Sequence, residues 1–435
     1  MKRLLILLVL TSLVSCKLYV SIPDENFEQA LIKLGCDDNL FPDGKVPKRK
    51  IDTLKVLIVR NKSISDLTGI ESFTDLQALH CYGNKLTSLD INNNTALTEL
   101  SCDGNKLTSL DVSKNTDLER LYCNDNQLLS LDVSKNTALK ILACESNQLK
   151  RLDVGKNTAL TVLGFGSNKL TSLDVSKNTF LTYLKFDYNQ LTSLDVSQNS
   201  ALTHLVCGKN QLTSLDVSSN TVLKTLYCSF NSLKSLDLSN NTALTELGCF
   251  NNQLTSLDVS GCKVLEELNC YKNKLTSLDV NGCKVLEELN CSKNKLTSLD
   301  VSQNTYLVEL FCQLNNQLTS LDVSRCKFLE ELHCSNNQLT SLDLSKNTAL
   351  TELSCDGNKL TNLDVSKNTA LTELGCGSNK LTGLDVSKNT ALIYLFCHSN
   401  QLTSLDLSNN TALTYLWCAG NNFDCDALKA KYNLE

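Results

Sequence analysis

Residues 350–370 read LTELSCDGNKLTNLDVSKNTA, and residues 371–391 read LTELGCGSNKLTGLDVSKNTA. From Leu76 onward the chain repeats one pattern, L-x-x-L-x-C-x-x-N-x-L-x-x-L-D-V-S-x-N-T-x, with one extra residue near Gln313. Such self-similarity predicts a stacked array, in which each unit buries its apolar residues against its neighbours. The repeat therefore decides the fold, and the 435 residues are expected to form one array rather than several separate domains.

Each unit consists of two similar halves, such as Leu350 to Asn358 and Leu360 to Asn368. The chain therefore turns twice per unit, and each half is expected to be a short extended segment that ends in a bend. Asn suits such bends because its amide can satisfy backbone groups that are turned away from water. We expect parallel strands on one side and short extended or turn-like segments on the other, since the unit is too short for a long helix.

The recurring pattern L-x-x-L-x-[LC]-x-x-N-x-L resembles a leucine-rich repeat. The short unit, with LxxLDL in its second half, resembles the 21-residue "IRREKO" class, and the chain is similar to secreted repeat proteins of flavobacterial type. The resemblance implies a repeat solenoid, a secreted or cell-surface location, and contacts with protein or glycan. It implies no catalytic residues.

The first residues, MKRLLILLVLTSLVSC, have a basic start and a short apolar stretch, which is typical of a secretory signal. Their end, Leu13 to Cys16, resembles a bacterial lipobox. The resemblance implies cleavage before Cys16, acylation of that cysteine and a lipid anchor in the cell envelope, with the outer membrane as the expected site. An ordinary signal peptide that is cut elsewhere is the alternative. No other stretch is apolar enough to cross a membrane.

The chain divides by pattern into four parts. Asp24 offers a helix start, and Phe27, Leu31 and Leu34 fall on one face of a short helix that would cover the open end of the array. The polar residues 37–50 are expected to form a loop. The four parts are a lipoprotein signal peptide at 1–15, an N-terminal cap at 16–53, an array of about eighteen turns at 54–423 and a C-terminal, partly helical cap at 424–435.

Cysteine occupies the same inward position in nearly every repeat, and 15 of the 21 cysteines belong to this cysteine column. The equivalent position is Phe165, Phe186 or Val59 elsewhere, so it is apolar and enclosed, and Cys acts there as a small hydrophobic residue. A metal site would need ligands that converge, whereas these thiols form a line without any CxxC pair. We predict mostly reduced, buried thiols. Cys262 and Cys283 lie on neighbouring turns and could pair, although replacement of Asn within a turn is the favoured interpretation.

Acidic residues recur elsewhere too. The segment DDNLFPDG, residues 37–44, lacks the alternating ligands and closing Glu of an EF-hand, so no calcium site is predicted there. An aspartate column runs through the second half of the repeats from Asp90 to Asp406. Its carboxylates should raise one another's pKa unless hydroxyls, backbone amides or cations compensate. A structural ladder is the favoured interpretation, and loose divalent-cation binding is the alternative.

The first half of the repeat varies at its outward positions, which points to a binding surface. A column of glutamates and a group of exposed aromatics are the candidate binding residues, and all four His lie on the same face. Aromatics set among polar residues are typical of recognition surfaces. The candidates are Glu246, Glu267, Glu288, Glu309, Glu331, Glu352, Glu373, Tyr394, Phe396, Tyr415 and Trp417, with Glu266, Glu287 and Glu330 beside the column and His80, His204, His333 and His398 on the face.

These features predict a monomeric, non-enzymatic leucine-rich-repeat protein that binds a macromolecule along this variable face. A catalytic set, a phosphate loop and a metal cluster are missing from the sequence, and no cofactor is expected. Nucleic acid is not an expected partner, since the formal charge is −6 and the only basic cluster is KVPKRK at 45–50. A basic protein segment would suit the glutamates. The alternatives are a glycan ligand on the aromatic group, or a structural spacer or adhesin with no selective ligand.

Overall fold

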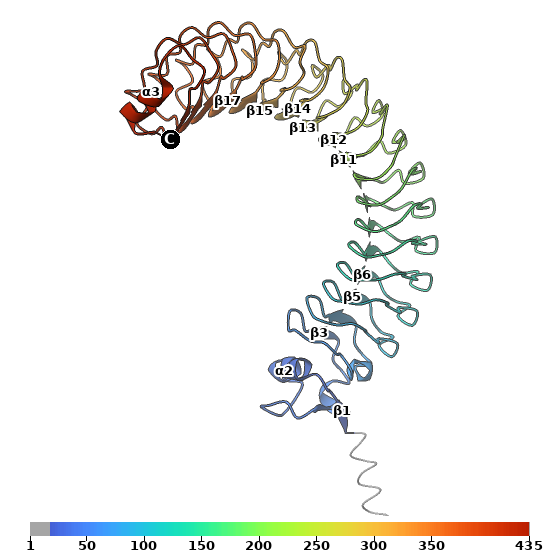
Figure 1. Ribbon diagram of the computed structural model, residues 1–435. Coiled ribbons are helices and arrows are strands. Elements are labelled where there is room, and N and C mark those ends of the chain that lie inside the picture. Colours follow the sequence, from blue (N-terminus) through green and yellow to red (C-terminus); the bar gives the residue numbers. More distant parts are fainter. Residues whose placement is uncertain (1–17, 435) are drawn as a thin grey trace, which may run out of the picture. The chain divides into compact units, whose positions relative to one another are not determined.

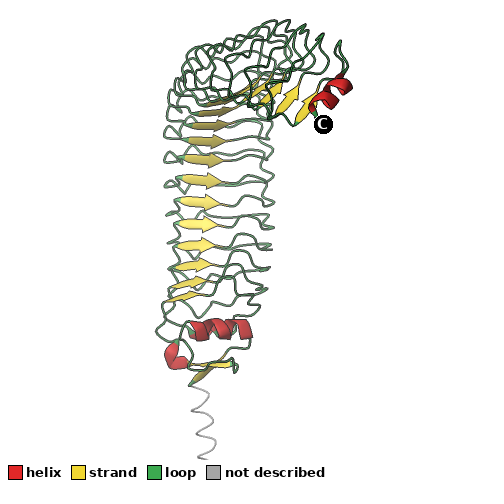
Figure 2. Cartoon of the chain, turned by 90° about the vertical axis from the view of Figure 1, so that its left-hand side faces the viewer, coloured by secondary structure: helices red, strands yellow, loops and turns green. Residues whose placement is uncertain are grey.

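The computed structural model describes residues 18–434, and it forms two compact units, one ending at Gln211 and the other beginning at Leu212. We describe each unit by itself. Both consist of short parallel strands joined by long, regularly repeated turns, so the predicted repeat solenoid of parallel strands is confirmed (Figures 1 and 2). The signal peptide and Cys16 lie outside the described residues. No helix within residues 18–434 is both long and apolar enough to cross a membrane.

The strands are three residues long. Figure 2 shows those of the first unit stacked one above another. The first unit contains β3 (Val56–Ile58), β4 (Ala78–His80), β5 (Glu99–Ser101), β6 (Arg120–Tyr122), β7 (Ile141–Ala143), β8 (Val162–Gly164), β9 (Tyr183–Lys185) and β10 (His204–Val206). The second contains β11 (Thr225–Tyr227), β12 (Glu246–Gly248), β13 (Glu267–Asn269), β14 (Glu288–Asn290), β15 (Glu309–Phe311), β16 (Glu331–His333), β17 (Glu352–Ser354), β18 (Glu373–Gly375), β19 (Tyr394–Phe396) and β20 (Tyr415–Trp417).

Strand register follows the repeat length, because each residue pairs with its equivalent in the next repeat. Leu332 pairs with Leu353, for example, and Leu353 pairs with Leu374. The middle leucine of each strand points inward and is buried, whereas the first and third residues face outward, as alternation along a strand requires. Sequence variation at the first and third positions therefore changes one surface without disturbing the core.

Asparagine side chains hold the bends after the strands. Asn358 donates to the carbonyl oxygens of Cys355 (3.0 Å) and Cys334 (3.1 Å), and its Oδ1 accepts the Leu339 amide at 3.0 Å. The residue before it, Gly357, has φ of 63°, and equivalent residues in most repeats share this left-handed turn. One buried side chain thus satisfies backbone groups in two successive repeats. Asn368 has a related role in the second half, where it donates to the backbone oxygens of Leu344 and Asn347 in the preceding repeat.

The cysteine column is fully buried, as predicted. Burial raises the pKa of Cys355 well above the ordinary thiol value, and the neighbouring thiols raise it further. Cys262 and Cys283 are free, and their thiols lie 3.7 Å and 3.4 Å from backbone oxygens where other repeats place an Asn amide. These two cysteines therefore replace Asn within the bends.

One column cysteine differs from the others, because Cys418 forms a disulfide with Cys425 of the C-terminal helix, with 5.6 Å between their Cα atoms. The sequence pattern predicts a line of mostly reduced thiols along the array and does not indicate this disulfide. The chain instead folds back over the last turn. The helix α3 (Cys425–Tyr432) is capped by Asp424, whose side chain accepts the Ala427 amide at 3.0 Å.

The N-terminal cap differs in part from the prediction. The helix α2 (Glu25–Lys33) forms, with Asp24 as its N-cap and with Phe27 and Leu31 buried, but Leu34 lies beyond the helix and is exposed. The helix ends one residue too early for Leu34 to continue the apolar face. The segment 37–50 is not entirely loop: β2 (Lys45–Pro47) pairs antiparallel with β1 (Tyr19–Ser21), and a 3-10 turn, η1 (Lys48–Lys50), follows. A second 3-10 turn, η2 (Ile70–Ser72), precedes the regular repeats.

Candidate ligand-binding face

The strand face of the second unit carries an unbroken glutamate column along the strands from β12 to β18. Glutamate is the first residue of every strand from β12 to β18, and each member pairs in register with the next. Like charges placed directly opposite each other on adjacent strands repel. The column is Glu246, Glu267, Glu288, Glu309, Glu331, Glu352 and Glu373.

Cationic partners distinguish the two units. In the first unit, Arg120 Nε lies 2.7 Å from Glu99, Lys140 Nζ lies 2.9 Å from Glu119, and Lys185 Nζ lies 2.6 Å from Glu145. Within residues 18–434, no member of the glutamate column forms an ion pair with a lysine or arginine. No lysine or arginine of the described residues therefore neutralises the glutamate column by direct contact, although His333 lies near two of its members.

Burial and mutual repulsion perturb these carboxyl groups. The pKa of Glu267 is raised, first by desolvation and then by Glu288 and other nearby glutamates. The pKa values of Glu309 and Glu373 are raised by the same two causes. Most members of the column are half-buried rather than freely exposed, which differs from the open stripe expected from the sequence. The difference arises because neighbouring strands bring the side chains together at close spacing.

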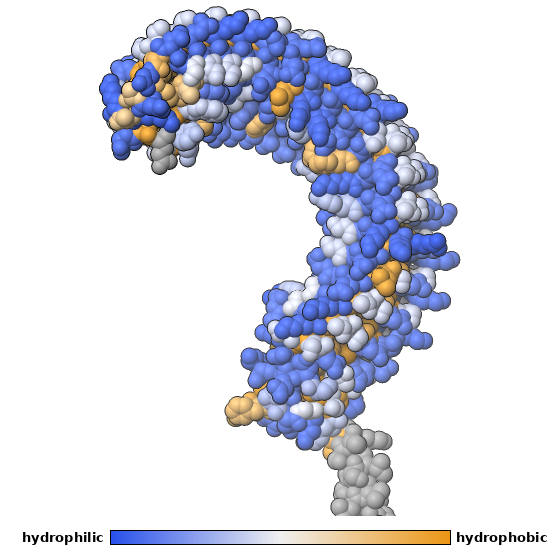
Figure 3. All heavy atoms as spheres, viewed as in Figure 1, coloured by the Kyte–Doolittle hydropathy of each residue, from blue (hydrophilic) through white to orange (hydrophobic). Residues whose placement is uncertain are grey.

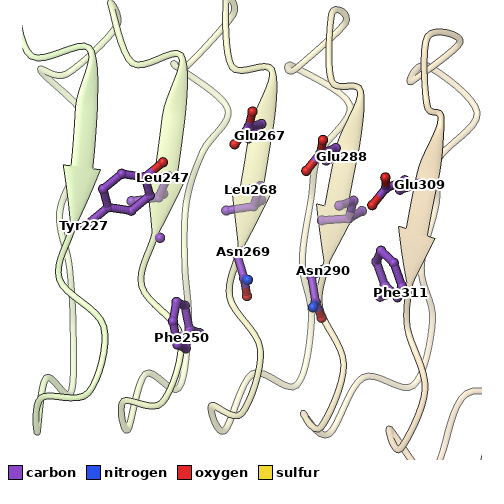
Figure 4. A pocket seen from close by; sticks show the side chains of 12 residues that line it. Tyr227, Leu247, Phe250, Glu267, Leu268, Asn269, Glu288, Asn290, Glu309 and Phe311 are labelled. Atoms are coloured by element: carbon purple, nitrogen blue, oxygen red, sulfur yellow. The ribbon is translucent and has the colours of Figure 1, made fainter. Parts of the chain in front are cut away.

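A pocket of about 270 Å³ lies across β11 to β15 at the middle of this column. Figure 4 shows three glutamates in a row, with asparagines beside them and a phenylalanine at either side. At one edge, the Tyr227 hydroxyl donates to Glu246 at 2.6 Å, and burial together with this bond raises the pKa of Tyr227. The side chains that shape the pocket are Tyr227, Phe250, Glu267, Asn269, Glu288, Asn290, Glu309 and Phe311. The predicted site residues did not include Tyr227, Phe250, Asn269, Asn290 or Phe311.

The predicted aromatic group lies on β19 and β20 of the same unit. Tyr394 pairs with Tyr415, and Phe396 pairs with Trp417. Tyr394, Tyr415 and Trp417 remain 44%, 39% and 46% exposed. These rings follow the glutamate column directly along the same face, because Glu373 pairs with Tyr394.

The four histidines have different positions. His80 and His333 end their strands and His204 begins one, whereas His398 follows the buried Cys397 and stacks on Trp417 at 3.8 Å. His333 stacks on Phe311 at 4.8 Å, and its Nε2 lies 3.9 Å from both Glu331 and Glu352. The histidines therefore lie in separate repeats and do not form a cluster, as their spacing along the sequence predicts.

The aspartate column belongs to the turns rather than to the strand face. Asp364 Oδ1 accepts the Ser366 amide at 2.9 Å, and the same bond recurs in most repeats. This amide bond and the Ser366 hydroxyl lower the pKa of Asp364, although the carboxyl group is exposed. Backbone amides and hydroxyls thus stabilise the charged form of these stacked carboxylates, which supports a structural ladder.

The side of the repeats seen in Figure 3 is mainly hydrophilic with scattered apolar side chains.

Comparison with known proteins supports the fold and the repeat class. No protein-family model matches the chain. A stretch of 73 residues is 45% identical to Internalin J of Listeria monocytogenes serotype 4b, and it covers 17% of this chain but only 8% of Internalin J. The functional domain of InlJ from Listeria monocytogenes, whose structure includes a cysteine ladder, is 36% identical with a TM-score of 0.66, and the match covers 91% of this chain and 78% of that domain.

A more distant likeness concerns the fold alone. The ectodomain of the plant receptor kinase GASSHO1/SCHENGEN3 from Arabidopsis thaliana, in complex with CASPARIAN STRIP INTEGRITY FACTOR 2, has 22% identity and a TM-score of 0.71, covering 85% of this chain and 53% of that one. The leucine-rich-repeat fold is typical of protein-interaction modules. Given the repeated sequence, the stacked parallel strands and the extensive match to the InlJ domain, the chain belongs to the leucine-rich-repeat family and is similar to the internalins.

Proposed function

We propose that this chain is a non-enzymatic binding protein whose glutamate column receives a cationic segment of another protein. The observation that supports this most directly is the contrast between the two units. Three glutamates on the first unit, Glu99, Glu119 and Glu145, have lysine or arginine partners, whereas seven consecutive glutamates on the second do not. A surface whose charges share one sign and have no neighbouring counter-charges attracts partners of the opposite charge and speeds their association.

The pocket suits a lysine or arginine side chain in particular. Its aliphatic stem would pack against Phe250 or Phe311, which lie at opposite ends of the pocket, while its charged end would reach one of the glutamates between them. Aromatic rings also attract cations at their faces. A bound cation would relieve the repulsion that raises the pKa values of the glutamates, so ligand binding and their ionisation are coupled.

We further propose that the protein is exported and held at the bacterial cell envelope by acylation of Cys16. The support is the N-terminal sequence, with its basic start, apolar stretch and lipobox-like end. An anchor at this end would leave the strand face free to meet a soluble or surface-bound partner. The resemblance to flavobacterial secreted repeat proteins supports the same location.

Binding of defined peptides tests the proposed partner chemistry. Peptides of one length with Lys, Arg, Gln or Glu at alternating positions would be immobilised and the mature protein passed over them. We expect the Lys and Arg peptides to bind and the Gln and Glu peptides not to bind. The association rate should fall as salt increases, since the Debye length shortens to about 8 Å at physiological ionic strength.

A matched pair of variants locates the binding face. Glu267→Gln/Glu288→Gln/Glu309→Gln removes three charges from the pocket, and Asp343→Asn/Asp364→Asn/Asp385→Asn removes three from the turns of the same unit. We expect about a tenfold lower association rate for the first variant and little change for the second. Equal effects of the two variants, or loss only in the second, would refute the proposal.

A glycan ligand is the second candidate, because Trp417 and Tyr415 keep large exposed rings. A glycan array probed with the native protein and with Trp417→Ala separates the two functions. Binding that depends on Trp417 and not on the three glutamates would favour the glycan.

A further inference from the structure

Three carboxylates converge in the N-terminal cap, away from the strand face. Glu28 lies on α2, and Asp37 and Asp43 lie in the segment that follows it. One oxygen from each carboxylate lies within 4.8 Å of an oxygen of both others. Glu28 is 1% exposed and Asp37 is 7% exposed, whereas Asp43 reaches solvent. Burying carboxylates close together is costly unless a positive charge or hydrogen-bond donors compensate.

Backbone donors compensate Glu28 and fix its position. Its Oε1 accepts the amides of Asp43 at 2.7 Å, Gly44 at 3.1 Å and Lys45 at 3.3 Å, and its Oε2 accepts the Gly44 amide at 2.9 Å. The far end of the loop is therefore tied to the helix. A carboxylate oxygen has two lone pairs, so Oε2, which accepts one bond, keeps a lone pair for a further interaction.

Asp37 lacks comparable compensation. Its Oδ1 accepts the Asn39 amide at 3.2 Å, but its Oδ2 is buried and has no hydrogen-bond partner within the described residues. The nearby basic side chains interact with other carboxylates: Arg49 and Lys50 contact Asp38 at 2.6 Å and 2.8 Å, and Lys45 contacts Asp43 at 3.6 Å. A buried carboxylate oxygen without a donor, on a side chain that meets two further carboxylates, is suited to a cation.

We propose that Glu28, Asp37 and Asp43 bind a calcium ion. Oxygen-only ligands and three negative charges suit a hard divalent cation. Calcium lies at about 2.3–2.6 Å from its ligands, so oxygens on opposite sides of one ion are up to about 5 Å apart. The three oxygens lie within 4.8 Å of one another, inside this limit. Magnesium, at about 2.0–2.1 Å, demands near-octahedral geometry and usually keeps several waters, so three converging carboxylates suit calcium better.

The arrangement also explains why the sequence pattern did not indicate calcium. In an EF-hand the closing glutamate follows the loop. Here the glutamate precedes the loop, on α2, and is brought to it by the fold of the cap. The bound ion would tie residues 37–44 to the helix at the end of the array where Phe27 packs on Phe73.

Hydrogen exchange of the mature full-length protein, followed by mass spectrometry, tests the site. We expect calcium to slow exchange in residues 37–45 at least tenfold relative to protein in a chelator, with a smaller effect of magnesium. The titration should extend to about 5 mM, because extracellular calcium modules have dissociation constants near 10⁻⁴–10⁻³ M. The response should disappear in Asp37→Asn and persist in Asp38→Asn, a matched change one residue away in a carboxylate paired with Arg49 and Lys50.

A second variant keeps the test decisive if Asp37→Asn fails to fold. Asp43 is exposed, so Asp43→Asn carries little folding cost and should weaken the calcium response about tenfold. Folding of each variant is checked by the exchange of α2 in the chelator. Lack of any calcium effect on residues 37–45 of the native protein would overturn the proposal. An equal effect in the native protein and in folded Asp37→Asn would also overturn it, because the ion would then be bound elsewhere.

Discussion

Replacing Asn358 by alanine tests how much one bend asparagine contributes to the array. The side chain is buried and makes three bonds of 3.0–3.1 Å to the backbone, at Cys355, Cys334 and Leu339. Alanine leaves the Leu339 amide without its partner and removes one of two donors from each carbonyl oxygen, because Asn337 still donates to Cys334 and Asn379 to Cys355. The unpaired amide costs about 1–3 kcal/mol, and each lost carbonyl bond costs about 0.5–1.5 kcal/mol. Because water can reach part of the bend, we expect a loss of about 2–4 kcal/mol.

The loss should be local, since each repeat contacts only its neighbours. Hydrogen exchange followed by mass spectrometry is therefore the appropriate assay. A cost of about 3 kcal/mol corresponds to roughly a hundredfold faster exchange, because each 1.4 kcal/mol is a factor of ten. We expect this acceleration in β16, β17 and the bends between them, beginning with the Leu339 amide. Strands β11 and β12 should keep their protection.

Two further variants sharpen the test. Asn362→Ala changes an exposed asparagine in the same repeat and should accelerate exchange less than threefold. Asn358→Asp keeps an acceptor for the Leu339 amide but loses the donors, so it should also be destabilising. The reasoning is refuted if Asn358→Ala exchanges no faster than Asn362→Ala.

Further predictions concern the thiols, the glutamates and the anchor. Cys355→Val should change the urea midpoint little, because the position is apolar, whereas Cys355→Asp should cost about 3–5 kcal/mol; equal midpoints would contradict this. Raised pKa values of Glu267 and Glu309 mean that the folded protein binds protons more readily than the unfolded chain, so these groups favour stability as pH falls through their folded pKa. Over the same interval a cationic peptide should bind more weakly and should release protons when it binds, as calorimetry in buffers of different ionisation enthalpy would show. Cys16→Ala should move the protein from the membrane to the soluble fraction while its circular dichroism is unchanged, since stable anchoring needs acyl chains; retention in the membrane would argue against that anchor.

The array could be predicted from sequence because each repeat carries the same pattern of buried and turn-forming residues. Most repeats have a leucine in the middle of the strand, a buried cysteine after it and an asparagine in the bend. Single departures therefore do not obscure the pattern. The fold class and the buried cysteine column are confirmed for this reason. The pairing of Cys418 with Cys425 could not be predicted, because it depends on how α3 folds back over the last repeat.

The caps and the site were less predictable. Leu34 fits the helical period but lies after the helix has ended, and β2 pairs with β1 through residues that carry no strand pattern. The outward position of the glutamates followed from alternation along the strand. Their raised pKa values and the contribution of Phe250 required the distances between neighbouring repeats, which the sequence does not specify.

The in-register stacking makes single repeats interchangeable. Excision of residues 350–370 would join Ala349 to Leu371 and recreate the local sequence NTALTEL without a new junction. The strands that meet across the gap would present the same leucine, cysteine and asparagine columns to each other. Recombination between such similar coding segments can therefore lengthen or shorten the array by whole repeats, adding or removing one glutamate at a time. Ligand length and charge could be matched in steps, while the packing inside the array is left unchanged.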